Sequence, residues 1–447
     1  MILVLMISTF VLWGSYSLFK KAAGTMKFTQ LSMISYVFYF DIILNTFIAS
    51  ILVVIGLADN HYMISITNDN VRVWGWILVL YSMITMPVGM LLMNRIYTIN
   101  SAKSFLHYLN VDVVFEDKDI FYKSMVIFCL IFSFLIITYI LFCLKSIPII
   151  TAIVYKNFSL AAVERAESKS LFDGIEYIRN LFGLYFIPII TYYIYILSET
   201  KKDKFYKILF FFSFILTTFL LLLDTQKAPI LKFILGFVIL RVLVFKSIKL
   251  RNVFIGLFIL CGVVVFQYTQ YTGRDVISLL SVDSPILNRI FIAQYGGMLL
   301  SLQWFPDIIK QSTAYIGLPA IISNLFDLPS VTSARLLMEN FNPIGVGLGS
   351  AGVINSYYIG EAWANYGVIG VIFAPFIVGM VIQFLHIFLI IHKKTPELMA
   401  FYAYITMNLG VTGGFVGFLY LKQLIFPFFL LCFFLFVKFI VRNFLKL

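Results

Sequence analysis

Long apolar runs separated by short polar turns make up most of this chain. Most runs approach or exceed the roughly 20 apolar residues that a helix needs to cross a bilayer. The pattern predicts an all-α, polytopic integral membrane protein with about 11 transmembrane helices. The expected helices are 1–18, 29–56, 73–94, 123–144, 179–198, 208–223, 229–245, 253–270, 366–391, 398–421 and 423–441. No internal repeat or linker interrupts them, so residues 1–447 are expected to form a single transmembrane domain.

The polar turns differ in charge, and this difference predicts the orientation of the chain. Basic residues in short loops mark the cytoplasmic side of a membrane protein. With the N-terminus outside, every basic turn and the basic C-terminus lie inside, together with 95–122, whose charges nearly balance. The basic residues of these turns are Lys20, Lys21, Lys27, Lys201, Lys202, Lys204, Lys207, Lys246, Lys249, Arg251, Lys393 and Lys394.

One long segment, 271–365, departs from the pattern and is predicted to lie outside, as a large loop containing short helices. Two apolar pieces within it, 286–303 and 314–327, must either both span or both not span, because a single extra span would move Lys393 outside. Their polar interruptions favour neither spanning. A membrane protein that keeps one large polar segment usually does its chemistry there.

Composition agrees with the pattern of runs. The chain is 61% hydrophobic and 12% charged, whereas a soluble protein has about 25% charged residues. The net charge of +12 could suit nucleic acid, but the basic residues sit in turns between spans, so the lipid bilayer is the expected partner. The first apolar run lacks a basic leader and a cleavage site and is expected to be retained as a span. The four cysteines, all in apolar runs, are expected to pack in the interior.

Arginine is distributed differently from lysine. Six of ten arginines fall on the predicted outer side: Arg72, Arg165, Arg179, Arg274, Arg289 and Arg335. Arginine offers a planar fork that grips phosphate or carboxylate with two hydrogen bonds. The outer bias therefore suggests an anionic ligand, with lipid-headgroup contact or structural ion pairs as the alternative for each arginine.

Two lysines near the outer membrane edge extend this cationic set. Lys227 lies in the polar turn 224–229, and Lys232 lies roughly 7.5 Å deeper at helical rise. An ionisable residue at that depth is a candidate site residue, although lysine can also extend its ammonium to the surface. We expect Arg165, Arg274, Arg289 and Lys227 to converge on one anionic pocket, with Lys232 and Arg335 as further binding candidates.

Glu361 is the outer carboxylate nearest to the start of a helix, and Tyr357, Tyr358 and Trp363 surround it. Aromatic faces next to a carboxylate suit a sugar, whose C–H face stacks on rings while its hydroxyls form hydrogen bonds. Glu361 could then act as a general base. The alternative is a helix-capping carboxylate among interfacial aromatics.

Asp275 and Glu339 are the next candidate bases in the long segment. None of the four histidines lies in that segment, and no paired-histidine or Ser-His-Asp arrangement is visible. The outer loops also lack an acidic metal-binding cluster. We therefore expect chemistry without a metal or a cofactor.

The stretch Asn355–Gly370, the turn Thr225–Lys227 and the late position of the large outer loop resemble the O-antigen polymerase (Wzy) family of membrane glycosyltransferases. The resemblance implies polymerisation of undecaprenyl-pyrophosphate-linked oligosaccharide repeat units, as donor and acceptor, into O-antigen or a related surface polysaccharide. It implies a site on the periplasmic face of the bacterial inner membrane, and it allows a chain-length regulator protein as a partner.

Two departures from that family are visible. An Arg-x10-Gly pattern of some members is not reproduced, because Arg165 and Gly174 have eight residues between them and Arg289 and Gly296 have six. The related ligases use a histidine in the large loop, which is absent here. The alternatives are a polysaccharide flippase or transporter, which usually shows paired broken helices, and a non-catalytic component of an envelope assembly.

Overall fold

The computed structural model describes residues 1–154, 160, 164, 172–223, 227–253, 255–256, 258, 262, 265, 288–313, 331–347, 351–419 and 422–444. In this part the chain is helical throughout and forms no sheet. The helices of its first half are α1 (Ile2–Ala23), η1 (Phe28–Gln30), α2 (Met33–Tyr36), η2 (Val37–Phe47), α3 (Ile48–Val54), α4 (Asp69–Ile96), α5 (Ser101–Asn110), α6 (Asp119–Cys143), α7 (Pro148–Val154), η3 (Ile178–Phe186), α9 (Ile187–Lys201) and α10 (Lys204–Leu222). They are followed by α11 (Lys227–Phe245), η4 (Asn288–Ile292), α15 (Ala293–Trp304), α17 (Ser333–Phe341), α18 (Pro343–Gly347), α19 (Tyr358–Ile391), α20 (Pro396–Asn408), α21 (Val416–Leu419) and α22 (Lys422–Phe444).

Nine helical stretches among the described residues are long and apolar enough to cross a membrane. They are Ile2–Gln30, Met33–Val54, Asp69–Ile96, Asp119–Cys143, Ile178–Lys201, Lys204–Leu222, Ala228–Phe245, Tyr358–Ile391 and Ile425–Phe444. The chain is therefore a helical membrane protein, as expected. The expected span 253–270 lies mostly outside the described residues, so the predicted total of 11 stays a prediction.

Two expected spans differ in detail. The expected helix 398–421 is interrupted: α20 ends at Asn408, and α21 begins only at Val416. Glycines cause the break, because Gly410 and Gly414 adopt φ values of 69° and 135°, which other residues rarely adopt. The helix expected at 366–391 begins earlier, at Tyr358, and bends at Gly367 (φ 55°, ψ −139°).

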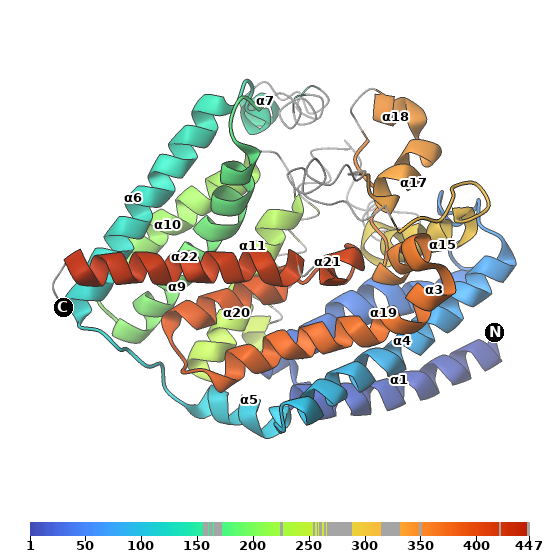
Figure 1. Cartoon of the computed structure of the whole chain (residues 1–447), viewed down its shortest axis with the longest axis horizontal. Helices are drawn as coiled ribbons and strands as arrows, with labels where there is room; N and C mark the ends of the chain where they lie inside the picture. The colour runs from blue at the N-terminus through green and yellow to red at the C-terminus, as the bar shows by residue number, and fades with distance from the viewer. Residues whose placement is uncertain are drawn as a thin grey trace.

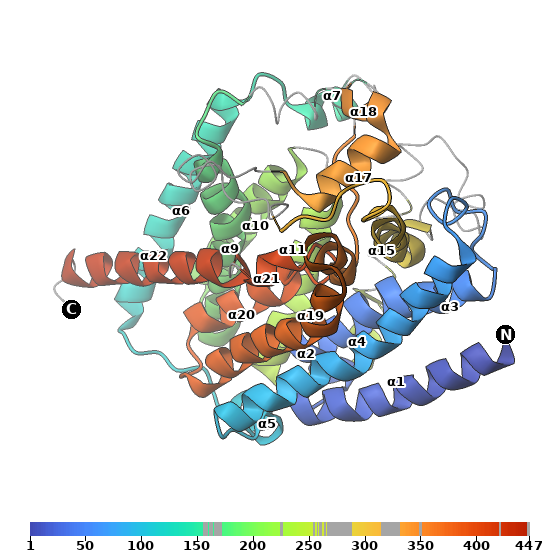
Figure 2. The same ribbon diagram turned by 45° about the vertical axis from the view of Figure 1, so that its right-hand side comes forward.

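The crossing of α4 and α19 forms the centre of one half of the bundle, where α1, α4 and α19 run side by side (Figures 1 and 2). Their backbones approach closely at glycines. A Cβ atom added at Gly379 would lie 2.0 Å from the Met86 carbonyl oxygen, and one added at Gly89 would lie 2.2 Å from that of Phe376. Small residues commonly allow such close approach of helices in membranes. The other half contains α6, α9, α10 and α11.

The segments expected inside meet at one end of the molecule, around the loop 111–118. Asp112 pairs with Lys246 at 3.9 Å, and the Val114 amide donates to the Lys394 carbonyl at 2.9 Å. Further ion pairs reach the remaining turns: Glu116 with Lys393 and Lys438, Asp117 with Lys438 and Arg442, and Asp119 with Lys123 and Lys201. The acidic residues of this loop, together with Asp119 at the start of α6, thus neutralise much of the basic end. Which side of the membrane this end faces stays a prediction.

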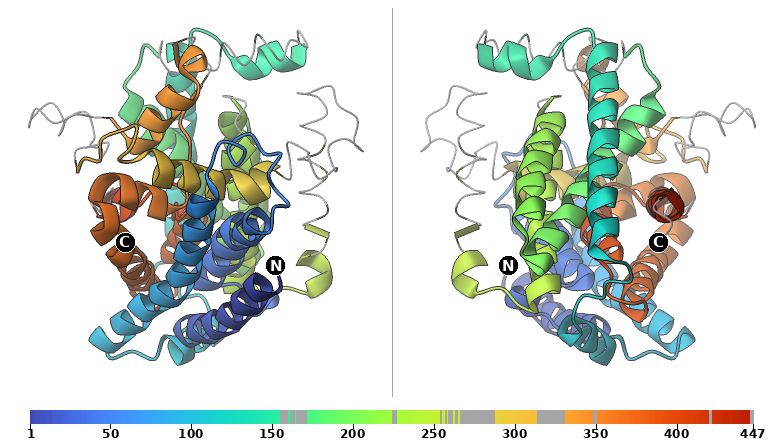
Figure 3. Two further views of the ribbon diagram at one scale, coloured as in Figure 1. Left: turned by 90° about the vertical axis from the view of Figure 1, so that its right-hand side faces the viewer. Right: turned by 90° about the vertical axis from the view of Figure 1, so that its left-hand side faces the viewer.

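The opposite end carries short helices and is named the outer end, after the orientation predicted from the sequence. In Figures 1 to 3, α7, α17 and α18 lie at the end away from α5. The apolar piece expected at 286–303 forms η4 and α15, which are not among the nine candidate spans. It packs inside the protein, with every residue from Tyr295 to Ser301 buried. The second piece, 314–327, lies outside the described residues.

Candidate functional site

Glu361 lies in the first turn of α19, directly against the break between α20 and α21. Its Oε2 accepts a hydrogen bond of 2.8 Å from the Val416 amide, at the start of α21. Gly414 lies so close that an added Cβ would be 2.4 Å from the same carboxylate oxygen. The side chain is half-buried. Glu361 therefore joins the starts of two helices, which is the capping geometry weighed from the sequence, and it does so at the outer end of the bundle.

The interruptions of α19 and of α20–α21 lie close together. The Tyr358 amide donates to the Val411 carbonyl at 3.2 Å, which ties the start of α19 to the broken segment. The 13 residues of α20 extend about 20 Å from the basic end, so the break falls in the half of a hydrocarbon core of about 30 Å that lies farther from that end. Irregular backbone at this depth is tolerated only where protein covers it or where it lines a watery cavity.

The aromatic residues near Glu361 pack against protein. Tyr357 and Tyr358 are 0% exposed, and the Tyr357 hydroxyl forms a hydrogen bond of 3.0 Å with Ser82. The Trp363 indole donates to the Phe305 carbonyl, which ties α19 to the end of α15. The three rings therefore hold the start of α19 in place. The two tyrosines are fully buried and cannot contact a sugar in this structure.

Lys232 lies on α11 beside a small cavity of about 40 Å³. Tyr192, Tyr404 and Asn408 line the same cavity, which has room for a few water molecules at roughly 10–15 Å³ each. Asn408 is the last residue of α20, so the cavity adjoins the broken segment. This arrangement brings Lys232 and the break to the same depth.

Asp41 is buried, and its carboxylate lies near enough to Lys232 for the two charges to influence each other, although the two side chains form no direct ion pair. Sequence reasoning missed this residue, although a single carboxylate within the apolar run 29–56 was the available signal. Asp41 lies in η2, an 11-residue π-helical stretch. Arg179 and Arg289 lie in the other described π-helical segments, η3 and η4. Such segments are frequent at functional sites.

Two of the arginines on the predicted outer side, Arg335 and Arg72, bind carboxylates and carbonyls of the protein itself. The Arg335 guanidinium pairs with Glu339 at 3.0 Å and donates to the Ala351 and Gly352 carbonyls at 3.2 and 3.1 Å. Arg72 likewise holds the loop 57–68, through Asp59 at 2.9 Å and the Ile64 carbonyl at 2.8 Å. Both guanidinium groups therefore bind other parts of the protein, which agrees with the alternative of structural ion pairs.

The remaining candidates are placed only in part. Arg289 is exposed and influences Tyr62, whose pKa is raised by burial and lowered to a lesser extent by this guanidinium. Lys227 begins α11, but its side chain is not among the described parts. Arg165, Arg274 and Asp275 lie outside the described residues. The convergence of Arg165, Arg274, Arg289 and Lys227 therefore stays a prediction.

Next to Tyr62, His61 is 4% exposed, and burial lowers its pKa to about 4. Its Nδ1 accepts a hydrogen bond of 3.2 Å from the Met63 amide, and its ring stacks on Tyr62 at 4.5 Å. Tyr62 in turn contacts Phe341 at 5.6 Å. A neutral histidine thus connects the loop 57–68 to the short helices of the outer end.

Comparison with known protein families, with curated protein sequences and with solved structures finds no match for this chain.

Proposed function

We propose that the chain is a glycosyltransferase that polymerises undecaprenyl-pyrophosphate-linked oligosaccharide repeat units at the outer end of the bundle. The observation that carries the proposal is the placement of Glu361, at the junction of two interrupted helices in the half of the bundle away from the basic end. The resemblance of Asn355–Gly370 to O-antigen polymerases points to the same residues.

A lipid-pyrophosphate donor brings its own leaving group, so the protein must position an acceptor hydroxyl and stabilise the departing charge. In the proposed reaction, the acceptor hydroxyl attacks the anomeric carbon of the donor sugar and the carbon–oxygen bond to pyrophosphate breaks. Glu361 takes the hydroxyl proton. Cations at the outer membrane edge, with Lys232 the one described at depth, balance the charge on the leaving pyrophosphate.

Glu361→Gln tests this proposal. The amide oxygen of glutamine can still accept the Val416 N–H bond, so the variant removes the base and keeps the cap. General-base help is worth about 10²–10⁴-fold in rate. We expect short or single-repeat glycans in a strain that carries only this variant, with a normal amount of protein in the membrane.

Glu339→Gln is the matched control, because Glu339 is an outer carboxylate, 42% exposed, that pairs with Arg335 on α17. It should leave chain length unchanged. Long glycans at the normal rate from Glu361→Gln would leave Glu361 as a cap only. Asp275 would then be the next base to examine, and Glu339 would follow only if its own variant shortened the glycans.

A polysaccharide flippase or transporter is the second candidate, because paired interruptions in α19 and α20–α21 are typical of transport proteins. A deletion strain separates the two functions. Loss of a polymerase leaves single repeats on the cell surface, whereas loss of a flippase leaves none.

A further inference from the structure

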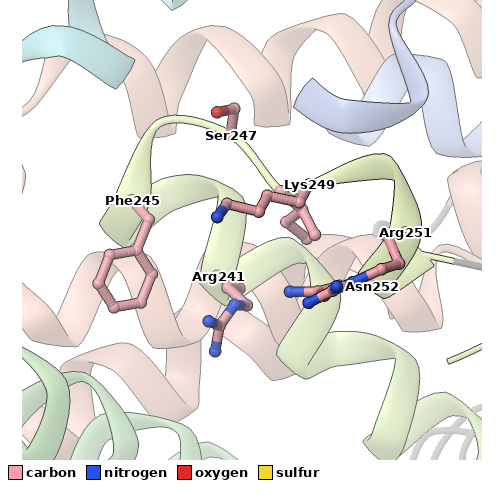
Figure 4. Close-up of a pocket in the computed structure, with 7 residues that line it drawn as sticks. Arg241, Phe245, Ser247, Lys249, Arg251 and Asn252 are labelled. Carbon is pink, nitrogen blue, oxygen red and sulfur yellow. The ribbon is translucent and has the colours of Figure 1, made fainter. Parts of the chain in front are cut away.

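A basic pocket of about 300 Å³ opens at the basic end of the molecule, where the chain turns after α11 (Figure 4). Arg241 comes from the last turns of α11, and Lys249 and Arg251 come from the turn and the helical residues that follow. In Figure 4 the side chains of Lys249 and Arg251 extend toward the side of the pocket that carries Arg241. Phe245, Ser247 and Asn252 complete most of the lining.

The pocket is held in shape by contacts outside its lining. The Arg241 guanidinium lies 5.1 Å from the centre of the Phe245 ring and interacts with the Tyr195 hydroxyl. The Ile248 amide donates to the Thr29 carbonyl at 2.9 Å, which fixes the turn against the start of the second span. The Asn252 amide donates to the Lys249 carbonyl at 2.9 Å. The turn is therefore ordered before any ligand arrives.

The charge of the pocket is not balanced by the protein in the part of the chain that the structure describes. There, Arg241, Lys249 and Arg251 form no ion pair with a carboxylate, and no acidic residue lines the pocket. Lys246, in the same turn, does pair with Asp112. The loop 111–118 thus neutralises its neighbours and leaves these three cations available.

We propose that this pocket binds the phosphate of an anionic phospholipid headgroup. The two guanidinium groups supply planar forks for phosphate oxygens, and Lys249 adds a third positive charge. The pocket lies at the end of the candidate span Ala228–Phe245, at the level where lipid phosphates meet a membrane protein. Phe245, 43% exposed, offers an apolar wall for the glycerol and acyl portion.

The test uses the full chain purified in a neutral detergent, with native mass spectrometry to count bound phosphatidylglycerol and, separately, phosphatidylcholine. Arg241→Gln and Arg251→Gln are compared with wild type and with Lys246→Gln, which removes the same charge from the same turn outside the pocket. Loss of a charged hydrogen-bonding partner costs about 1.5–3 kcal/mol, so each arginine variant should weaken one phosphatidylglycerol site roughly 10- to 100-fold. The control should bind like wild type, and phosphatidylcholine should not fill the site.

Inorganic phosphate and pyrophosphate, added in separate titrations, distinguish a lipid from a soluble source. Displacement of the lipid only at a large excess of either ion supports the proposal. Equal binding of both phospholipids, unchanged phosphatidylglycerol binding in both arginine variants, or preference for the free ions would overturn it. The side chains are exposed, so the variants should fold, and size-exclusion profiles check this. None of these outcomes bears on the outer site around Glu361.

Discussion

Acidification should loosen the outer loop 57–68 through a single side chain, His61. An unfolded histidine titrates near pH 6.5, whereas burial lowers the pKa of His61 to about 4. Between these values the unfolded loop binds more protons than the folded loop, so stability is fully present above pH 6.5 and is lost as the pH falls toward 4. Protonation also removes Nδ1 as the acceptor for the Met63 amide.

The two pKa values fix the size of the effect. At pH 5 the folded loop should be destabilised by about 2 kcal/mol relative to pH 7.5, or roughly 30-fold in the equilibrium for opening. The full difference, reached below pH 4, is roughly 3 kcal/mol. The backbone hydrogen bonds of His61, Ile64 and Thr67 lie within the loop, so exchange of these amides reports its opening.

Hydrogen exchange measured by mass spectrometry on peptides covering 57–68 gives the assay, with exchange rates corrected for the intrinsic effect of pH. His61→Asn is the comparison, because its amide oxygen can replace Nδ1 as acceptor but does not titrate. Wild type should lose protection between pH 7.5 and pH 5 by about 30-fold relative to the variant. The same pH dependence in both proteins would show that the buried histidine is not the cause.

Two further predictions concern packing and charge inside the membrane. Gly379→Ala should destabilise the protein by about 1–3 kcal/mol, because its Cβ would lie 2.0 Å from the Met86 carbonyl oxygen. Thermal unfolding in detergent measures this loss. Gly14→Ala is the control and should have little effect, because its Cβ would lie 4.0 Å from the nearest atom. Asp41→Asn should lower the unfolding temperature, because it removes the carboxylate that offsets part of the Lys232 charge. Asp41→Asn combined with Lys232→Met should recover part of that loss, and additive losses in the double variant would exclude the coupling.

The sequence was sufficient to predict that the basic turns gather at one end of the molecule. The positive-inside pattern placed the basic turns together, and the structure brings 28–30, 111–119, 246–252 and 393–397 into direct contact. The sequence could not show that the loop 111–118 is the element that joins the basic turns. Its charges nearly balance, and pairs such as Asp117 with Arg442 join residues far apart in the chain.

The candidate site was less predictable for two physical reasons. The run 398–421 is apolar throughout, so hydropathy could not separate a continuous helix from one broken by glycines at positive φ. The guanidinium group of arginine binds backbone carbonyls and carboxylates as well as phosphate. The excess of arginines on the predicted outer side therefore indicated where positive charge lies, but not which group each arginine binds. Arg335, with Glu339 and two carbonyls around it, illustrates this.

The acidic loop 111–118 also has a consequence for biosynthesis. Asp117 is made early, whereas Arg442 follows 325 residues later, and Lys438 comes only shortly before it. Until the last helix is inserted, this carboxylate and the buried Glu397 have to remain without the cations that pair with them in the finished protein. Ribosomes that stop before α22 would thus release a chain with uncompensated acidic groups at its basic end. Insertion of α22 is therefore the step that supplies the cations for these carboxylates, so the charge balance of the basic end depends on a helix made long after the loop.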